Sequence, residues 1–207
     1  MFYMRRTNIS AENGLGINIK FLTQFLIHPT KIGAIAPSNN KLCDMITDMA
    51  ELPQISSVVE FGSGTGVITE KIVNKISKDT TFFAMEINET LVEATKERCP
   101  GATVYQSSAS NAKKHLEMHG EEGCDRIISS LPWSTFGEEL QDDLLETIMD
   151  VLNPGGKFLT YAYVPGLVFP SARRFRNKLH EKFDKVTKSK TVWTNFPPAF
   201  IYYAEKT

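Results

Sequence analysis

The stretch Ser57–Ile72, SVVEFGSGTGVITEKI, joins an apolar run to three alternating glycines and then to a helical pattern. The glycines are Gly62, Gly64 and Gly66. Glycines at the end of a strand let a ligand approach the backbone closely, because no side chain is in the way. The dinucleotide fingerprint G-x-G-x-x-G requires a glycine at its sixth position, where this chain has Val67. The phosphate loop G-x-x-x-x-G-K-[ST] is also absent. The turn therefore predicts a ligand site without the features that select a pyrophosphate.

Two acidic residues accompany this turn. Glu60 lies two residues before the first glycine, where its carboxylate can accept a hydrogen bond from an ammonium or amine group. Glu86 ends the next predicted strand, where a carboxylate can accept hydrogen bonds from both hydroxyls of a ribose. Adenosine together with an amino acid fits this pair better than a dinucleotide does.

Downstream of Ser57, short β-rich runs alternate with helical patterns, which predicts βαβ units and a parallel sheet covered on both faces. The stretches 183–196 and 198–207 predict two more strands, one of them antiparallel. We expect one doubly wound α/β domain over residues 1–207, with a seven-stranded, mostly parallel sheet in 53–207 and an N-terminal helical cap in 1–52. The expected strands are 57–61, 80–86, 102–107, 125–131 and 155–164, and the expected helices are Leu15–His28, Ser38–Ala50, Val67–Ser77, Glu89–Cys99, Asn111–His119 and Glu138–Leu152.

Composition excludes several classes of protein. The 207 residues have a net charge of −1, so no global excess of charge demands a nucleic acid partner. Three scattered cysteines are too few for a disulfide framework or a metal cluster, and His115 and His119 lack a third ligand, so we expect no metal. The first ten residues lack the apolar run that is typical of a signal peptide, and no stretch of the sequence reaches the roughly 18 apolar residues of a transmembrane helix. We expect a cytoplasmic protein, either soluble or peripheral at the inner face of the cell membrane.

The elements VVEFGSGTG, EIN, ISSLPW and LNPGGKF occur in the order found in class I S-adenosylmethionine-dependent methyltransferases, which the chain resembles. The resemblance implies a Rossmann-like fold and S-adenosylmethionine as cofactor. It also implies that acids and turn backbone hold the methionine part and the ribose, while other residues contact the adenine or border the pocket. The implied cofactor-binding residues are Ser38, Glu60, Gly62, Ser63, Gly64, Gly66, Glu86, Ile87, Ser108, Ala109 and Ser129.

The segment ISSLPW is expected beside the methyl group, at the carboxyl edge of the sheet. Relatives that methylate the exocyclic nitrogen of adenine carry [DN]-P-P-[YFW] or N-L-P-Y here, with an amide or carboxylate as acceptor and an aromatic ring for stacking. This chain has Ser130 in place of that acceptor and Trp133 as the ring. The predicted catalytic residues are Ser129, Ser130, Leu131, Pro132 and Trp133.

Three segments narrow the resemblance further. FLIHPTKIGAIAPSNNKL, ISSLPW and VWTNFPPAFIYY resemble bacterial phospholipid N-methyltransferases, which methylate phosphatidylethanolamine and are themselves similar to ribosomal RNA adenine dimethyltransferases. The resemblance implies a phospholipid amine as acceptor. Three alternatives stay open: an adenine of ribosomal RNA, a soluble amine, and a membrane adaptor that binds the cofactor without turnover.

A lipid acceptor requires contacts for a cationic nitrogen and for a membrane. Five aromatic residues, Trp133, Tyr161, Tyr163, Tyr202 and Tyr203, are candidates to surround the nitrogen. The stretch Arg173–Lys190 carries eight basic and two acidic residues, which suits an anionic membrane, although a solvated helix and hairpin or a site for RNA phosphates would have the same charge. The helix at 15–28 is a second candidate for membrane contact, and the alternative is that it simply caps the fold. The predicted substrate-binding residues are Trp133, Tyr163, Arg173, Arg174, Arg176 and Asn195.

Overall fold

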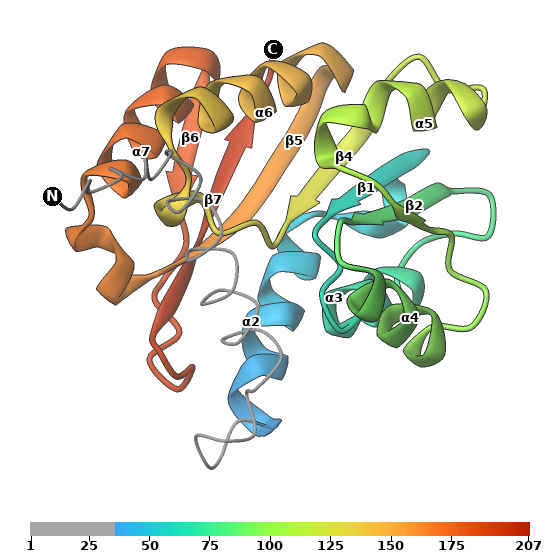
Figure 1. Ribbon diagram of the computed structural model, residues 1–207, viewed down its shortest axis with the longest axis horizontal. Coiled ribbons are helices and arrows are strands. Elements are labelled where there is room, and N and C mark those ends of the chain that lie inside the picture. The colour runs from blue at the N-terminus through green and yellow to red at the C-terminus, as the bar shows by residue number, and fades with distance from the viewer. Residues whose placement is uncertain (1–35) are drawn as a thin grey trace, which may run out of the picture.

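A seven-stranded sheet forms the centre of the computed structural model, which describes residues 36–207 and their side chains from residue 40 onward. The strand order is β3-β2-β1-β4-β5-β7-β6, and β7 alone runs antiparallel to both of its neighbours (Figure 1). This confirms the predicted mostly parallel sheet. The strands are β1 Ser57–Phe61, β2 Thr81–Glu86, β3 Val104–Gln106, β4 Cys124–Ser129, β5 Leu152–Tyr163, β6 Lys185–Lys188 and β7 Ala199–Glu205.

Helices cover both faces of the sheet, and the five helices predicted within the described residues are found with ends shifted by a few residues. The α-helices are α2 Ala36–Met49, α3 Val67–Val73, α4 Glu89–Arg98, α5 Ala112–Met118, α6 Glu138–Val151 and α7 Pro170–Lys182. The described residues also form four short 3₁₀ turns, η2 Leu52–Gln54, η3 Ala109–Asn111, η4 Trp133–Thr135 and η5 Val164–Val168. The expected helix at 15–28 lies outside the described residues.

Helix α7 and strand β6 occupy the basic stretch for which a solvated helix and hairpin was one of the alternatives. In α7, Ala172, Phe175 and Leu179 recur at helical spacing, and all three are buried. They place one stripe of α7 on the sheet and leave the basic side chains around it.

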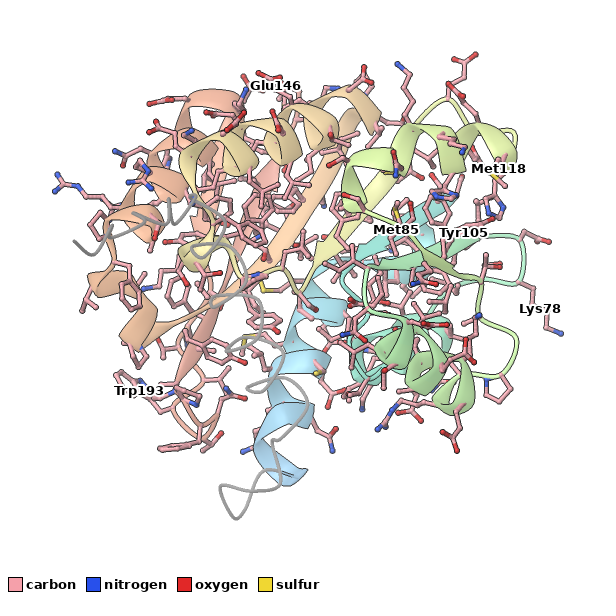
Figure 2. The ribbon with its side chains drawn as sticks, viewed as in Figure 1. Lys78, Met85, Tyr105, Met118, Glu146 and Trp193 are labelled. Carbon is pink, nitrogen blue, oxygen red and sulfur yellow. The ribbon has the colours of Figure 1, made fainter. Side chains whose placement is uncertain are left out.

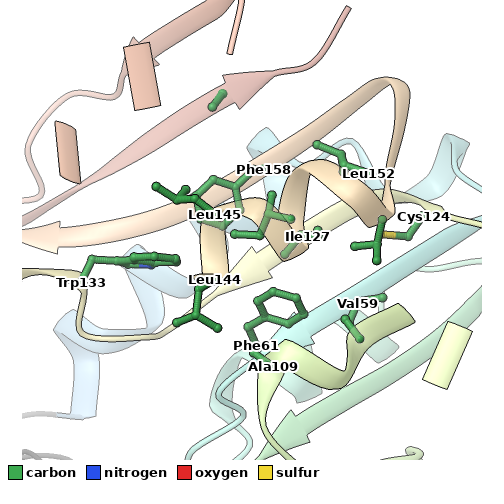
Figure 3. Close-up of a cluster of buried hydrophobic side chains, with 14 of the residues drawn as sticks. Val59, Phe61, Ala109, Cys124, Ile127, Trp133, Leu144, Leu145, Leu152 and Phe158 are labelled. Carbon is green, nitrogen blue, oxygen red and sulfur yellow. The ribbon is translucent and has the colours of Figure 1, made fainter. Parts of the chain in front are cut away.

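Two hydrophobic clusters lie on opposite faces of the sheet. On one face, Phe61 and Phe158 pack with residues of α5, α6 and α7 (Figure 3). On the other face, Val58 and Leu159 pack with residues of α2 and α3, and α4 lies on that same side (Figure 1). Successive residues of a strand point to opposite faces, so Glu60, between Val59 and Phe61, points to the α2–α3 face.

The loops that follow β1, β2 and β4 meet at the carboxyl edge of the sheet. Gly62 N donates to Met85 O at 2.8 Å, and Ser130 N donates to Phe61 O at 2.9 Å. Strand order reverses between β1 and β4, and open α/β sheets bind their ligands where the order reverses. The fold thus brings the glycine turn and the segment ISSLPW together.

Helix α2 is joined to the sheet by charged groups at its C-terminal end. Arg126 Nε donates to Ala50 O at 2.6 Å. The Glu51 carboxylate lies 3.5 Å from Arg126 Nη2 and 2.6 Å from Lys157 Nζ. The pKa of Glu51 is lowered, chiefly by the hydrogen bond from Lys157. These contacts fix the helix that covers the Glu60 side of the sheet.

The glycine turn depends on close packing against α4, and a pair of glycine substitutions tests this. A Cβ on Gly66 would lie 3.1 Å from Thr95 Cα, whereas a Cβ on Gly120 would meet nothing within 4 Å. Both glycines have a positive φ, +79° and +75°. Alanine in this conformation costs roughly 1–2 kcal/mol, and overpacking adds roughly 1–3 kcal/mol.

We expect Gly66→Ala to lower the free energy of unfolding by about 2–5 kcal/mol, and Gly120→Ala to lower it by about 1–2 kcal/mol. Chemical denaturation of both variants measures the difference. Equal losses would show that contact with α4 is not what requires a glycine at position 66.

Candidate active site

The glycine turn presents bare backbone to open space. Gly64 has φ +57°, and a Cβ built on it would meet nothing within 4 Å. Its N–H donates to Glu86 Oε2 at 3.1 Å. The Ser63 side chain, in contrast, is buried, and its hydroxyl lies 3.0 Å from Thr95 Oγ1. A ligand that approaches this turn therefore meets the backbone around Gly64 and not the Ser63 hydroxyl.

Glu86 joins the turn after β1 to the turn after β2. One carboxylate oxygen accepts from Gly64 N, and the other accepts from Asn88 N at 3.0 Å. A carboxylate offers about four acceptor positions, so this one can still receive two hydroxyls. The adjacent Ile87 is exposed and offers an apolar surface next to that position. Both features suit the predicted ribose and adenine contacts.

Glu60 is a buried acid with one unpartnered oxygen. Thr69 Oγ1 donates to Glu60 Oε2 at 2.6 Å, while Oε1 has no hydrogen-bond partner among the described residues. Burial raises the pKa of Glu60 to about 8, with a smaller contribution from the negative charge of Glu86, against the lowering effect of the Thr69 hydrogen bond. A cation beside Oε1 would satisfy this oxygen and favour the ionised carboxylate. Sequence reasoning did not identify Thr69, whose only signal is its place in the first turn of the helix after the glycines.

The segment ISSLPW borders the glycine turn through Ser130 and Leu131. A Cβ on Gly62 would lie 3.1 Å from Leu131 Cδ2, and the Ser130 hydroxyl is hydrogen-bonded to Tyr161. Ser129 is buried, and its hydroxyl accepts from Leu131 N and Trp133 Nε1, each at 3.2 Å. Ser129 therefore shapes the loop. Ser130, in contrast, is partly exposed.

The prediction that the Trp133 ring stacks on the substrate is wrong for this structure. Trp133 is 3% exposed, and its ring is stacked on Phe175 of α7, with centroids 4.4 Å apart. It belongs to the cluster on the α5–α7 face (Figure 3), whereas Glu60 points to the opposite face. Burying a large aromatic ring under α7 is favourable, and the Ser129 hydroxyl satisfies the indole N–H, so the ring is a core residue.

Of the four tyrosines considered for a cationic nitrogen, Tyr161 lies next to Ser130, and Tyr163 lies against Tyr161. Tyr161 and Tyr163 are hydrogen-bonded to each other, and their rings meet edge to face at 5.5 Å. Burial raises the pKa of both hydroxyls, so both are neutral near pH 7. Tyr202 is buried on the opposite face against Phe175 and Phe200. Tyr203 lies near Lys157, towards the amino edge of the sheet.

The remaining predicted cofactor residues and the histidine pair differ in their surroundings. Ser108 is exposed and caps η3 by accepting from Ser110 N at 3.3 Å, whereas Ala109 is buried. The Ser38 side chain lies outside the described residues. His115 stacks on Tyr105 with centroids 4.0 Å apart, and the described part of the chain contains no group of three or more potential metal ligands.

The predicted substrate residues near the C-terminus lie on the flank of the sheet. Asn195 Nδ2 donates to Pro197 O at 2.6 Å, so it shapes the connection between β6 and β7. Arg174 is half-buried. Arg173 and Arg176 line a groove of about 620 Å³ between α7 and β6. The structure does not bring these arginines to the glycine turn.

Comparison with known proteins identifies the class. A family described as a methyltransferase domain matches residues 58–156. Magnesium protoporphyrin IX methyltransferase from Synechocystis, solved with bound S-adenosylmethionine, has a similar fold, with a TM-score of 0.68 at 11% identity, over 97% of this chain and 100% of that one.

Two curated proteins are similar in sequence. Ornithine lipid N-methyltransferase of Singulisphaera acidiphila is 30% identical over 186 residues, which cover 88% of this chain and 93% of that protein. Ribosomal RNA small subunit methyltransferase A of Salinibacter ruber is 32% identical over 92 residues, or 44% of this chain and 30% of that protein.

The chain belongs to the class I S-adenosylmethionine-dependent methyltransferases. Within this class it resembles the lipid N-methyltransferases. Its residues fit the cofactor: Glu60 offers an unpartnered oxygen to an ammonium or sulfonium, Gly64 gives open backbone, and Glu86 retains acceptor positions for a ribose. Bound S-adenosylmethionine supplies a methyl group activated by the positive sulfur.

The buried carboxyl of Glu60 predicts proton release when the cofactor binds. The pKa of Glu60, about 8 in the folded protein, lies above the ordinary 4.5. A cation favours the ionised form, so binding at pH 7 should release up to one proton more in the natural protein than in Glu60→Gln. Calorimetry in two buffers of different ionisation enthalpy measures this difference.

The same raised pKa has a consequence for stability. The unliganded fold retains a proton that the unfolded chain loses above pH 4.5, so stability falls as the pH rises from about 4.5 to about 8. Glu60→Gln removes this loss and should unfold at a higher temperature at pH 7. Identical proton release and identical thermal unfolding in the two proteins would contradict the assignment of Glu60.

Proposed function

We propose that this enzyme transfers methyl groups from S-adenosylmethionine to the amine nitrogen of a lipid head group at a membrane surface. The observation that carries the proposal is the 30% identity to an ornithine lipid N-methyltransferase across nearly the whole of both chains. The geometry around Ser130 supports it, because the position that holds an amide or carboxylate in adenine N-methyltransferases holds a small hydroxyl here.

The reaction requires an unprotonated nitrogen. A C–N bond forms as the C–S bond breaks, so the amine proton must leave before or during attack, and the enzyme contributes mainly by orientation. Glu60 and Glu86 would hold the cofactor while the hydroxyls of Ser130 and Tyr161 border the acceptor. Because the tyrosine hydroxyls are neutral near pH 7, they would orient the nitrogen by hydrogen bonding and leave the proton to pass to solvent. The rings of Tyr161 and Tyr163 offer π-faces to a nitrogen that becomes cationic.

Two lipid amines are candidates, and both end in a primary amine. The resemblance in the segments around GAIAPS and NFPPAF favours phosphatidylethanolamine, and the curated relative favours ornithine lipid. An adenine of ribosomal RNA is less well supported. The similarity to the ribosomal RNA enzyme covers only 30% of that protein, and the ring of Trp133 is covered by Phe175.

Radiolabelled S-adenosylmethionine and a panel of acceptors test the proposal. Vesicles containing phosphatidylethanolamine or ornithine lipid are compared with soluble ethanolamine, soluble ornithine and ribosomal RNA. We expect label in the lipid fraction of at least one vesicle sample, and its suppression by S-adenosylhomocysteine. Label confined to RNA or to the soluble amines would refute a lipid acceptor, and cofactor binding without label in any sample would indicate an adaptor.

Removal of one hydroxyl tests the acceptor side of the site. Tyr161→Phe deletes the group that is hydrogen-bonded to Ser130. We expect turnover to fall about threefold to tenfold, the value of one hydrogen bond, with an unchanged dissociation constant for the cofactor.

Tyr203→Phe is the matched control. It removes a hydroxyl 3.2 Å from Glu205 on the same pair of strands, away from Ser130. Steady-state kinetics and calorimetry separate turnover from cofactor binding. Equal effects of the two substitutions would remove Tyr161 from the acceptor site.

A further inference from the structure

We propose that two loops at the carboxyl edge of the sheet form a docking surface for an anionic lipid bilayer. We call this surface the apolar lip. The inference rests on the proposed function, because a lipid acceptor must be reached where it lies in a membrane. The lip consists of Leu167, Val168 and Phe169, at the junction of η5 and α7, and of Trp193 and Phe196, in the connection between β6 and β7.

The lip gathers large apolar side chains that are exposed. Val168 is 81% exposed, Phe169 52%, Trp193 73% and Phe196 66%, and Leu167 is also exposed. Only four other large apolar residues in the described part of the chain are exposed, and they lie elsewhere in the sequence. Scattered exposed residues are ordinary, but apolar residues gathered on neighbouring loops mark an interaction site. Tryptophan is also favoured where a protein meets the boundary between lipid and water.

The two loops of the lip are adjacent in space. Val164 N donates to Pro198 O at 2.8 Å, and Tyr163 is paired with Ala199 where β5 meets β7. Figure 2 shows Trp193 at the lower left of the molecule, at the opposite end from Lys78 and Met118. The apolar side chains therefore contribute to one end of the molecule.

Unpaired basic residues flank the lip. The groove between α7 and β6 is lined by Arg173, Arg176, His180 and Lys188, and no acidic residue lines it. In the described part of the chain neither arginine forms an ion pair, and Lys188 Nζ lies 3.7 Å from the centroid of the Phe200 ring. If the apolar side chains of the lip enter the acyl-chain region of an anionic bilayer, the basic groups behind them lie at the level of the lipid phosphates.

The other lysines of this stretch do not contribute to the groove. Lys178 pairs with Asp142 at 2.5 Å, Lys182 lies 4.0 Å from Glu146, and Lys185 lies 3.8 Å from Glu205. The basic stretch is therefore divided between three lysines that pair with acids, two on α7 and one on β6, and the arginines and Lys188 of the groove, which form no ion pair in the described part of the chain. This division concentrates the free positive charge next to the lip.

The lip is connected to the loop after β4, which contains the segment ISSLPW. A Cβ on Gly166 would lie 3.3 Å from Ser134 Oγ, and Ser171 Oγ donates to Ser134 O. Gln141 Nε2 donates to both Trp133 O and Ser171 O, at 2.8 and 3.0 Å. These contacts join the start of α7 to the residues that directly follow Ser130–Leu131. A bilayer that covers the lip would thus lie next to the acceptor side of the site.

Intrinsic fluorescence can detect docking without a label. The chain has two tryptophans, and Trp133 is 3% exposed whereas Trp193 is 73% exposed, so a change in emission on docking reports Trp193. Vesicles of phosphatidylglycerol are compared with vesicles of phosphatidylcholine, with and without brominated acyl chains. We expect a blue shift and bromine quenching with the anionic vesicles, and weaker binding at high salt.

Paired variants identify the surface. Flotation with phosphatidylglycerol vesicles compares Phe169→Ser/Trp193→Ser with Met118→Ser, whose native side chain is 63% exposed at the other end of the molecule. It also compares Arg173→Glu/Arg176→Glu with Lys78→Glu. We expect each lip or groove variant to weaken binding at least about tenfold, and each control to change it less than about twofold.

Activity in detergent micelles separates docking from catalysis. Phe169→Ser/Trp193→Ser should retain cofactor binding and turnover of amine lipid dispersed in detergent, and lose turnover on vesicles. Unchanged vesicle binding in the lip variants, equal binding to neutral vesicles, or a dimer in sedimentation that Trp193→Ser dissociates would overturn the proposal. Docking as predicted without methylation of any lipid would refute the proposed function and leave the surface in place.

Discussion

The structure of the site depends on two carboxylates at the ends of neighbouring strands. Glu86 accepts from Gly64 N and from Asn88 N, and so holds two turns together. Glu60 lies buried nearby, with one oxygen bonded by Thr69 and the other unpartnered. Burial raises the cost of ionising Glu60, and the negative charge of Glu86 adds to that cost. A cationic ligand offsets this cost, which is why the arrangement suits a sulfonium that also carries an ammonium group.

The sheet separates the roles of the residues around this pair. Glu60, Tyr161 and the buried side of α2 share one face, where the cofactor and the acceptor would meet. Trp133 and α7 share the other face, where they form part of the core. Within four residues, the segment ISSLPW passes from the face of the sheet that carries Glu60 to the face that is covered by α7. Ser130 can therefore border the reactants while Trp133, three residues later, anchors the loop.

The sequence predicted the outline of the site better than the roles of individual side chains. Glu60, Gly64 and Glu86 were identified because their positions follow from strand ends, and strand ends are visible as short patterns of apolar residues. Ser129 and Trp133 were assigned to chemistry because local spacing does not reveal which face of a loop is covered. The helix that covers Trp133 begins only at Pro170, and packing between such distant segments is not encoded in a short motif.

From local periodicity and residue types at fixed spacing, the sequence predicts the parallel sheet with one antiparallel strand and the bare turn between two acids, and a resemblance in its motifs indicates the class of enzyme. Tertiary structure alone decided that Glu60 keeps an unpartnered oxygen, that Tyr161 and not Trp133 lies beside Ser130, and that several lysines of the basic stretch are neutralised by acids of α6 and β7. The reason is that burial, pairing and exposure are set by contacts between residues far apart in the chain, which no single stretch of sequence contains.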